Sequence, residues 1–173
     1  MSVWLVRHPR VLSDHRICAG RFEWPLAESF DREVVAIREQ LPWEPNVVWS
    51  APSMRCQRAA VGIGGVVEVD ARLAELNFGQ WEGRRWADIY GAESKAWTED
   101  PWTRRPPEGE TGDELEKRVA AVRAEILAKA RSANVAVVTH DGVIRAWRRI
   151  ASNASRAEAA EWSVPCGTVW PLD

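Results

Sequence analysis

The sequence predicts an α/β fold in which helices cover both faces of a mostly parallel sheet. Short runs rich in β-branched and aromatic residues recur along the chain, each bounded by turn-forming residues, as strands are. Segments in which apolar residues recur at helical spacing lie between these runs. A broad alternation of strand and helix is typical of a sheet with helices on both faces.

Five segments have the character of strands. Each is short and rich in Val, Trp or Thr, and such side chains favour a position in a sheet. In chain order the predicted strands are residues 2–6, 47–49, 66–69, 135–139 and 167–170.

Helices are predicted from spacing and from start signals. Apolar residues line one helical face of segment 30–41. A capping-box pattern, in which Ser or Thr is followed three residues later by Glu, begins at Thr111 ahead of a long apolar-periodic segment. The same pattern begins at Ser155 and predicts a short helix near the end of the chain.

Residues 70–110 depart from this alternation because they are rich in Trp, Pro, Arg and Glu. Within them, the segment from Trp86 to Trp97 is expected to be helical. Since they offer no material for a separate core, we expect an excursion over one edge of the sheet and a single domain over residues 1–173. The tryptophans are expected to pack this excursion against the sheet or, alternatively, to form an aromatic wall for a flat substrate group.

Composition and charge narrow the classes of partner. The chain has 173 residues, of which 46% are hydrophobic and 28% charged, and a formal net charge of −2. Such a balance gives no basis for binding nucleic acid or a membrane surface. The apolar runs are too short to cross a bilayer, and the N-terminus lacks a signal-peptide pattern. Because Cys18, Cys56 and Cys166 show no metal-type spacing, we expect a cytoplasmic protein with reduced thiols.

Cationic and titratable residues follow four of the predicted strands. In chain order they are Arg7 with His8, then Arg55, Glu75 and His140. Each alone is more often a surface or scaffold residue, but the carboxyl ends of parallel strands form the edge at which ligands bind, so their coincidence favours a shared site. A site with two arginines, two histidines and one carboxylate is suited to binding an anion and to transferring a proton, and not to binding an apolar ligand. The remaining histidine, His15, is expected to be a surface residue.

Five sequence blocks resemble the histidine phosphatase superfamily, also called phosphoglycerate mutase-like. They are LVRHP, SAPSMRCQRAA, LAELNFGQWEG, PPEGET and VAVVTHDGVIRAW, in that order along most of the chain. Within the superfamily, RCQRAA and FGQWEG are most similar to alpha-ribazole phosphatases. The resemblance implies a phosphoglycerate mutase-like fold, which is a three-layer αβα sandwich with a central, mostly parallel sheet.

The resemblance also implies a phosphohistidine intermediate, and the residue types suit that chemistry. His8 would attack phosphorus as a neutral imidazole, while Arg7 and Arg55 would hold the phosphoryl oxygens. His140, protonated beside the phosphate, would donate a further hydrogen bond. Glu75 would protonate the leaving oxygen and then accept a proton from the attacking water. We therefore expect a metal-independent phosphoric monoester hydrolase of the histidine acid phosphatase type, with no cofactor and with alpha-ribazole 5′-phosphate as a candidate substrate.

The blocks depart from the family pattern at two places. Pro9 stands where the family has glycine, so this position offers no N–H to a phosphate. The segment after it is short, and Arg21 is a candidate substitute contact. The block EGET stands where GGES is common, which leaves open whether Gly109 and Glu110 contact the substrate. Arg84, in the Trp- and Arg-rich excursion, is a further candidate for substrate binding.

Three alternatives stay open. A metal-dependent phosphoesterase could use His8, His140, Glu75 and Asp141, although the flanking arginines would repel a metal and no HxxxH or HxD cluster is present. A silent phosphate-binding adaptor could dispense with His8 or Glu75. A phosphoglycerate mutase-type enzyme would return the phosphoryl group to its substrate, but a short excursion that admits water favours hydrolysis. The expected partner is a small phosphate monoester, with nucleoside-like 5′-phosphates preferred, and the chain is expected to be a monomer or homodimer.

Overall fold

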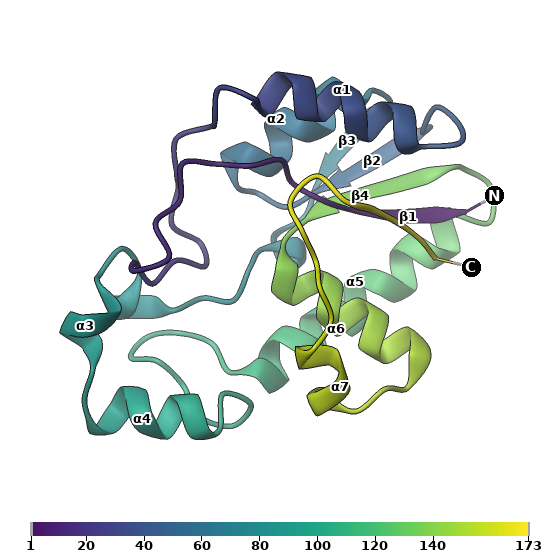
Figure 1. Ribbon diagram of the computed structural model, residues 1–173. Helices are drawn as coiled ribbons and strands as arrows, with labels where there is room; N and C mark the ends of the chain where they lie inside the picture. Colours follow the sequence, from purple (N-terminus) through teal and green to yellow (C-terminus); the bar gives the residue numbers. More distant parts are fainter. Residues whose placement is uncertain (1, 173) are drawn as a thin grey trace.

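The computed structural model describes residues 2–172, where a sheet lies between two layers of helices (Figure 1). Its strands are β1 (Val3–Arg7), β2 (Val47–Ser50), β3 (Val66–Val69), β4 (Val135–Thr139) and β5 (Val169–Leu172). The five strands lie in the order β3-β2-β4-β1-β5. Strands β1 to β4 pair in parallel, whereas β5 runs antiparallel to β1. The three-layer αβα fold with a mostly parallel sheet is therefore confirmed.

The two helical layers come from different parts of the chain. Helices α1 (Phe30–Gln40) and α2 (Met54–Ile63) pack together on one face, and α5 (Gly112–Lys129) and α6 (Asp141–Ser152) on the other (Figure 1). Helix α7 (Arg156–Ala160) follows α6. Both predicted capping boxes form, since the hydroxyls of Thr111 and Ser155 accept hydrogen bonds from the third residue of their helices.

The sheet interior explains the apolar character of the strands. All five residues of β4 are buried, because this central strand is covered by helices on both faces. The predicted range of β4 matches the structure, whereas the last strand begins two residues later than predicted. Gly167 has a φ of 74° and donates its N–H to the carbonyls of Arg7 and His8. It therefore belongs to the turn that leads into β5.

The excursion from residue 70 to 110 contains α3 (Trp86–Ile89) and α4 (Ala92–Glu99), so the predicted helix is broken in two. It supplies most of a small apolar cluster that is separate from the main core, so the expectation that these residues offer no material for a core was wrong. In this cluster Phe78, Trp86 and Trp97 pack on the buried Cys18, Trp81 and Ile89. These tryptophans contact one another and do not line the main cavity, so they form no aromatic wall there. They also do not pack against the sheet as expected, because their cluster is separate from the core of the sheet.

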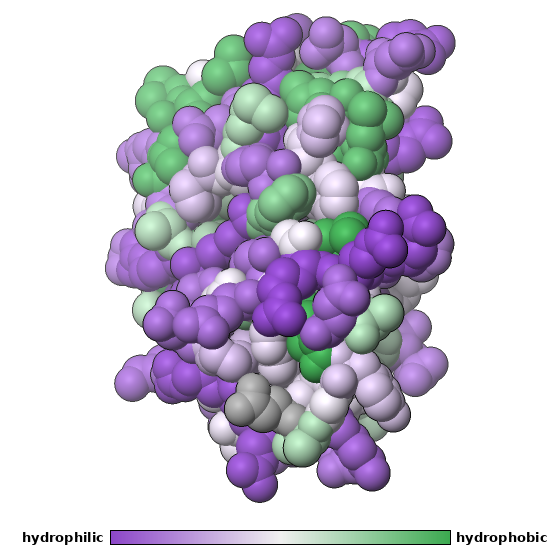
Figure 2. Space-filling view, turned by 90° about the vertical axis from the view of Figure 1, so that its left-hand side faces the viewer, coloured by the Kyte–Doolittle hydropathy of each residue, from purple (hydrophilic) through white to green (hydrophobic). Residues whose placement is uncertain are grey.

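Figure 2 views the side of the molecule that carries α3 and α4, where hydrophilic residues predominate and hydrophobic ones are spread among them. None of the helices within residues 2–172 combines the length and the hydropathy needed to cross a bilayer.

Candidate active site

One cavity of about 480 Å³ lies where the parallel strands end. Strands β1 and β4 end in register, with Arg7 paired to Thr139, and β2 ends beside them. The residues that follow these strands are therefore brought to one edge of the sheet. The lining of the cavity contains every residue for which the sequence suggested a catalytic role: Arg7, His8, Arg55, Glu75 and His140.

The His8 imidazole is fixed in one tautomer. Its Nδ1 lies 2.7 Å from the Pro9 carbonyl, which accepts a hydrogen bond, so Nδ1 carries the proton and Nε2 keeps its lone pair. Arg55 Nε donates to this Nε2 across 3.3 Å. Burial, together with the nearby positive charges of Arg55 and Arg7, lowers the pKa of His8 to about 3. The imidazole is therefore neutral, and the lone pair of its Nε2 accepts a hydrogen bond from Arg55, one of the arginines that would hold an anion.

The departure at Pro9 does not disturb this arrangement. The orienting hydrogen bond uses the Pro9 carbonyl, which any residue would supply, and not the N–H that proline lacks. What proline removes is one main-chain donor beside the histidine, so a phosphate receives no hydrogen bond from the N–H of this position.

Arg55 is buried and held on all sides. Its Nη1 donates to the carbonyl of Phe22 and its Nη2 to the carbonyl of Gly20, each across 3.0 Å. Its Nε reaches His8, and its Nη2 also lies 3.4 Å from Nδ1 of His140. The two carbonyls fix the guanidinium in place, and a phosphoryl oxygen would replace the His8 imidazole as the partner of Nε.

Arg7 offers an unused donor. Its Nη1 donates to the carbonyl of Val164 and lies 3.6 Å from Oδ1 of Asp141. Its Nε is buried and has no hydrogen-bond partner within residues 2–172. Because a buried donor without a partner is costly, this N–H is well suited to an anion in the cavity.

His140 is held between Arg55 and Ser53. It is buried, its Nδ1 faces Arg55 Nη2, and its Nε2 lies 3.3 Å from the hydroxyl of Ser53. The pKa of His140 lies well below its usual range. Burial is the largest cause of this shift, and the charges of His8, Arg55 and Arg7 add to it. His140 is therefore neutral in the free site, and the prediction of a protonated His140 beside a bound phosphate stays a prediction. Only the negative charge of a bound phosphate would favour protonation.

Glu75 is clamped by two main-chain amides. Leu76 N–H donates to Oε1 across 2.9 Å and Gly142 N–H donates to Oε2 across 3.0 Å. The second amide belongs to the first turn of α6, whose free N–H groups favour a carboxylate. Burial nevertheless raises the pKa of Glu75 above its ordinary value, and the nearby Asp141 adds to the rise. A carboxyl group that retains its proton more readily is suited to general acid catalysis.

The four predicted substrate-binding residues all lie outside the lining of the main cavity, but one of them lies beside the site. Arg21 lies beside the site, where its Nε donates to the Glu75 carbonyl across 3.0 Å, and it lines an adjoining hollow of about 250 Å³. Arg84 is exposed and donates to the carbonyl of Asp88, outside the cavity lining.

Gly109 and Glu110 also lie outside the lining of the main cavity. Gly109 packs against the Asn77 carbonyl, and a Cβ added to it would lie 2.6 Å from that oxygen. The Glu110 carboxylate accepts two hydrogen bonds from Arg118, at 2.6 and 2.8 Å. Both residues support the loop that carries Glu75, and the structure does not bring either to the phosphate side of the site.

Sequence reasoning missed several residues that complete the site. Glu23 accepts from the Met54 amide at the start of α2 and lies 3.3 Å from Arg55 Nη1, so it fixes both. Ser53 precedes the same helix, and its hydroxyl faces His140 instead of capping the helix. The strand-end position of Ser53 was a usable signal, whereas nothing local marks Glu23.

The outer wall of the cavity comes from the loop that follows β1. His15, predicted to be a surface residue, is exposed but lines the cavity, as do Ser13 and Trp24. Over the described stretch 2–172, no group of three or more His, Cys, Asp or Glu side chains is arranged to hold a metal ion.

Comparison with known proteins is consistent with this geometry. The family model of the histidine phosphatase superfamily (branch 1) matches residues 3–171. A provisionally assigned phosphoserine phosphatase of Hydrogenobacter thermophilus is 28% identical over 153 residues, which cover 83% of this chain and 75% of that protein. A bifunctional protein of Mycobacterium tuberculosis is 32% identical over 160 residues, or 87% of this chain, but the match spans only 44% of that longer protein.

Solved structures are similar over nearly the whole chain. The alpha-ribazole phosphatase of Shigella flexneri superposes with a TM-score of 0.90 at 22% identity, covering 100% of this chain and 90% of that one. A mycobacterial glucosyl-3-phosphoglycerate phosphatase superposes with a TM-score of 0.83 at 25% identity, covering 98% and 88%. The likeness extends to the fold, and both neighbours are phosphatases.

Proposed function

Because the chain belongs to the histidine phosphatase superfamily, we propose that it hydrolyses small phosphate monoesters through a phosphohistidine formed on Nε2 of His8. The observation that carries this proposal is the state of His8. Its proton is held on Nδ1 by the Pro9 carbonyl, and its unprotonated Nε2 faces Arg55. A neutral imidazole with an unprotonated nitrogen beside a guanidinium has the lone pair that attack on a phosphorus atom requires.

The first step transfers the phosphoryl group to the enzyme. Arg7 Nε and the Arg55 guanidinium bind phosphoryl oxygens, and Arg55 Nε thereby leaves the lone pair of His8. Nε2 then forms a bond to phosphorus while the bond from phosphorus to the ester oxygen breaks. Glu75 gives its proton to that oxygen, so the product leaves as a neutral alcohol. The positive charge that develops on the imidazole is stabilised by the Pro9 carbonyl.

The second step reverses the role of Glu75. Its carboxylate, held by the amides of Leu76 and Gly142, accepts a proton from water as the water oxygen attacks phosphorus. The bond from phosphorus to Nε2 breaks, inorganic phosphate leaves, and His8 returns to its neutral form. Glu75 is protonated again and ready for the next cycle.

The positive charge for both steps comes from side chains, so no metal enters the proposal. A contact between unit charges about 4 Å apart contributes about 4 kcal/mol at an effective dielectric constant near 20. Arg7 and Arg55, with His140 as a donor once a phosphate favours its protonation, supply such contacts on one side of the cavity. Preorganised donors of this kind are usually the largest source of catalysis.

The alcohol part of the substrate is proposed to carry a planar ring. The cavity continues outward from the phosphate side to Trp24, on the loop after β1. An indole there can stack on a ring, which contributes about 1–3 kcal/mol for a nucleic-acid base. The similarity to an alpha-ribazole phosphatase supports alpha-ribazole 5′-phosphate as the candidate to test first.

Product analysis separates hydrolysis from mutase transfer and from mere binding. With alpha-ribazole 5′-phosphate, free phosphate is expected to appear catalytically, and Trp24→Ala should lower kcat/KM for it roughly tenfold while sparing a small alkyl phosphate. The protein is also incubated with 3-phosphoglycerate and a trace of the bisphosphate. Formation of 2-phosphoglycerate faster than free phosphate would identify a mutase, and no turnover of any ester would identify a phosphate-binding adaptor.

A further inference from the structure

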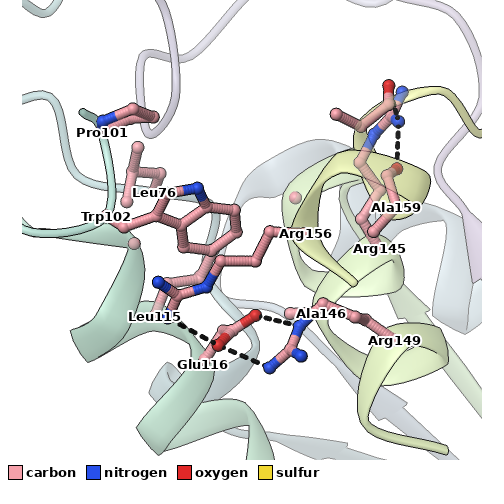
Figure 3. Close-up of a pocket in the computed structure, with 13 residues that line it drawn as sticks. Leu76, Pro101, Trp102, Leu115, Glu116, Arg145, Ala146, Arg149, Arg156 and Ala159 are labelled. Atoms are coloured by element: carbon pink, nitrogen blue, oxygen red, sulfur yellow. Dashed lines mark hydrogen bonds and ion pairs between the residues drawn. The ribbon is translucent and has the colours of Figure 1, made fainter. Parts of the chain in front are cut away.

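A second cavity, of about 190 Å³, is lined by Leu76, which follows Glu75 in the chain, and by Gly142. Helices α5, α6 and α7 and the segment around Trp102 enclose it, as Figure 3 shows. Apolar side chains supply most of its wall: Leu76, Pro101, Trp102, Leu115, Ala146 and Ala159. Neither histidine of the active site lines it.

The charged residues around this cavity already have partners. Arg145 pairs with Asp141, Arg149 with Glu116 and Arg156 with Asp113. The guanidinium of Arg156 also lies 4.1 Å from the centre of the Trp102 ring (Figure 3). Because each guanidinium is paired, the cavity presents no free cation to an anionic ligand, and an uncharged apolar ligand fits it best.

The size of the cavity restricts the ligand further. An apolar cavity of about 150 Å³ binds benzene. At about 190 Å³, the present cavity has room for a slightly larger molecule, such as a fused pair of rings. The indole of Trp102 in its wall favours an aromatic partner, because aromatic rings attract one another beyond the area that they bury.

Two of the lining residues connect this cavity to the chemistry. Leu76 and Gly142 both line it, and their main-chain amides are the two donors that hold the Glu75 carboxylate, at 2.9 and 3.0 Å. We propose that the cavity is a regulatory site for a small, neutral, planar apolar molecule, whose occupant restrains Glu75 through Leu76 and Gly142. Binding stands on the cavity alone, whereas the regulatory effect rests on the proposed function of Glu75.

The direction of the effect follows from the clamp. To hand its proton to a leaving oxygen, Glu75 must shift relative to the two amides that hold it. An occupant packed against Leu76 and Gly142 resists that shift, so it slows reactions that depend on proton transfer. Esters whose alcohol leaves readily without a proton are affected less.

Indole is a suitable probe, and the intact protein is titrated with it. Amide resonances of Leu76 and Gly142 are expected to shift in a saturable way when followed by 1H–15N NMR. At saturation, kcat for an alkyl phosphate should fall at least about fivefold, the lower end of usual coupling between sites, with a smaller change for nitrophenyl phosphate.

Two matched substitutions on α7 provide the controls. Ala159→Leu fills the cavity and should abolish the indole-dependent shifts, whereas Ala157→Leu, at an exposed position of the same helix, should leave them intact. If Ala159→Leu lowers the melting temperature, Ala160→Leu, which lines the cavity from an exposed position, replaces it.

The outcomes separate binding from regulation. Absence of saturable shifts at Leu76 and Gly142, or shifts that persist in the filled variant, would overturn the site. Saturable shifts with equal rate changes on both esters would overturn the coupling to Glu75. If the protein hydrolyses neither ester, the proposed function fails, but the NMR titration still decides whether the cavity binds indole.

Discussion

Replacing Gly142 with alanine tests whether the position of the Glu75 carboxylate controls proton transfer. A Cβ added at this position would lie 2.4 Å from Oε1 and 3.2 Å from Cδ of Glu75. Such distances are too short for non-bonded contact, so one of the groups must move. Gly142 is not among the residues with positive φ, and alanine fits the backbone of α6. We therefore expect the carboxylate to move and the helix to stay.

The expected magnitudes differ for stability and for rate. Alanine is favoured over glycine within a helix by about 0.5–1 kcal/mol, which offsets part of the clash. A displacement of about 1 Å at a catalytic group can cost about 100-fold in rate. The kcat for an alkyl phosphate is thus expected to fall about 100-fold in Gly142→Ala, with little change in the melting temperature.

The assay compares two esters and two variants. Nitrophenyl phosphate should lose much less activity than the alkyl ester, since a nitrophenolate leaves without a proton. Gly91→Ala is the control, because a Cβ there would meet nothing closer than the Ile89 carbonyl at 3.9 Å. An unchanged rate on the alkyl phosphate, in a Gly142→Ala protein that folds normally, would refute the reasoning.

Three further predictions concern the proton, the metal and the pH. Glu75→Gln should slow alkyl phosphates strongly and spare nitrophenyl phosphate in steady-state assays; equal losses would point to a structural role. Activity should survive EDTA and be inhibited by vanadate, whereas loss on chelation with recovery on adding a divalent ion would favour a metalloenzyme. Because the pKa of His8 falls from 6.5 to about 3 on folding, the unfolded chain binds this proton more tightly, and stability should fall as the pH drops through that window. Denaturant titrations at a series of pH values should show a smaller loss of unfolding free energy on acidification in His8→Gln than in the wild-type protein, and an unchanged loss in His15→Gln. The same dependence of unfolding free energy on pH in His8→Gln and the wild-type protein would contradict the lowered pKa of His8.

The sheet and the inner site could be predicted because local patterns determine them. The apolar run of β4 and the capping box at Thr111 are short-range signals that the structure reproduces. The convergence of His8, Arg55 and His140 follows from the parallel sheet, which brings strand ends to one edge.

The outer part of the site could not be predicted in the same way. Trp24 and His15 reach the cavity through the path of an irregular loop, and Glu23 reaches Arg55 across a long sequence separation. Arg84 was suggested by its charge, but its guanidinium is directed to the carbonyl of Asp88. Loop paths depend on many long-range contacts, so composition alone did not locate these side chains.

The neutral state of His140 in the free site could not be predicted from the sequence either. Its pKa depends first on burial and then on the charges of His8, Arg55 and Arg7, none of which a strand-end position reveals. The excursion shows the same limit, because Trp86 and Trp97 form a cluster with Trp81 and do not line the cavity of the active site.

Trapping the covalent intermediate tests the central claim most directly. The protein is mixed with a 32P-labelled monoester, quenched within milliseconds in alkaline detergent and analysed for bound label. We expect label that is stable to alkali and labile to acid, absent from His8→Ala and retained in His15→Ala, whose histidine lines the same cavity. Label of that kind in a folded His8→Ala protein, or its absence from a wild-type protein that is turning over, would contradict the account.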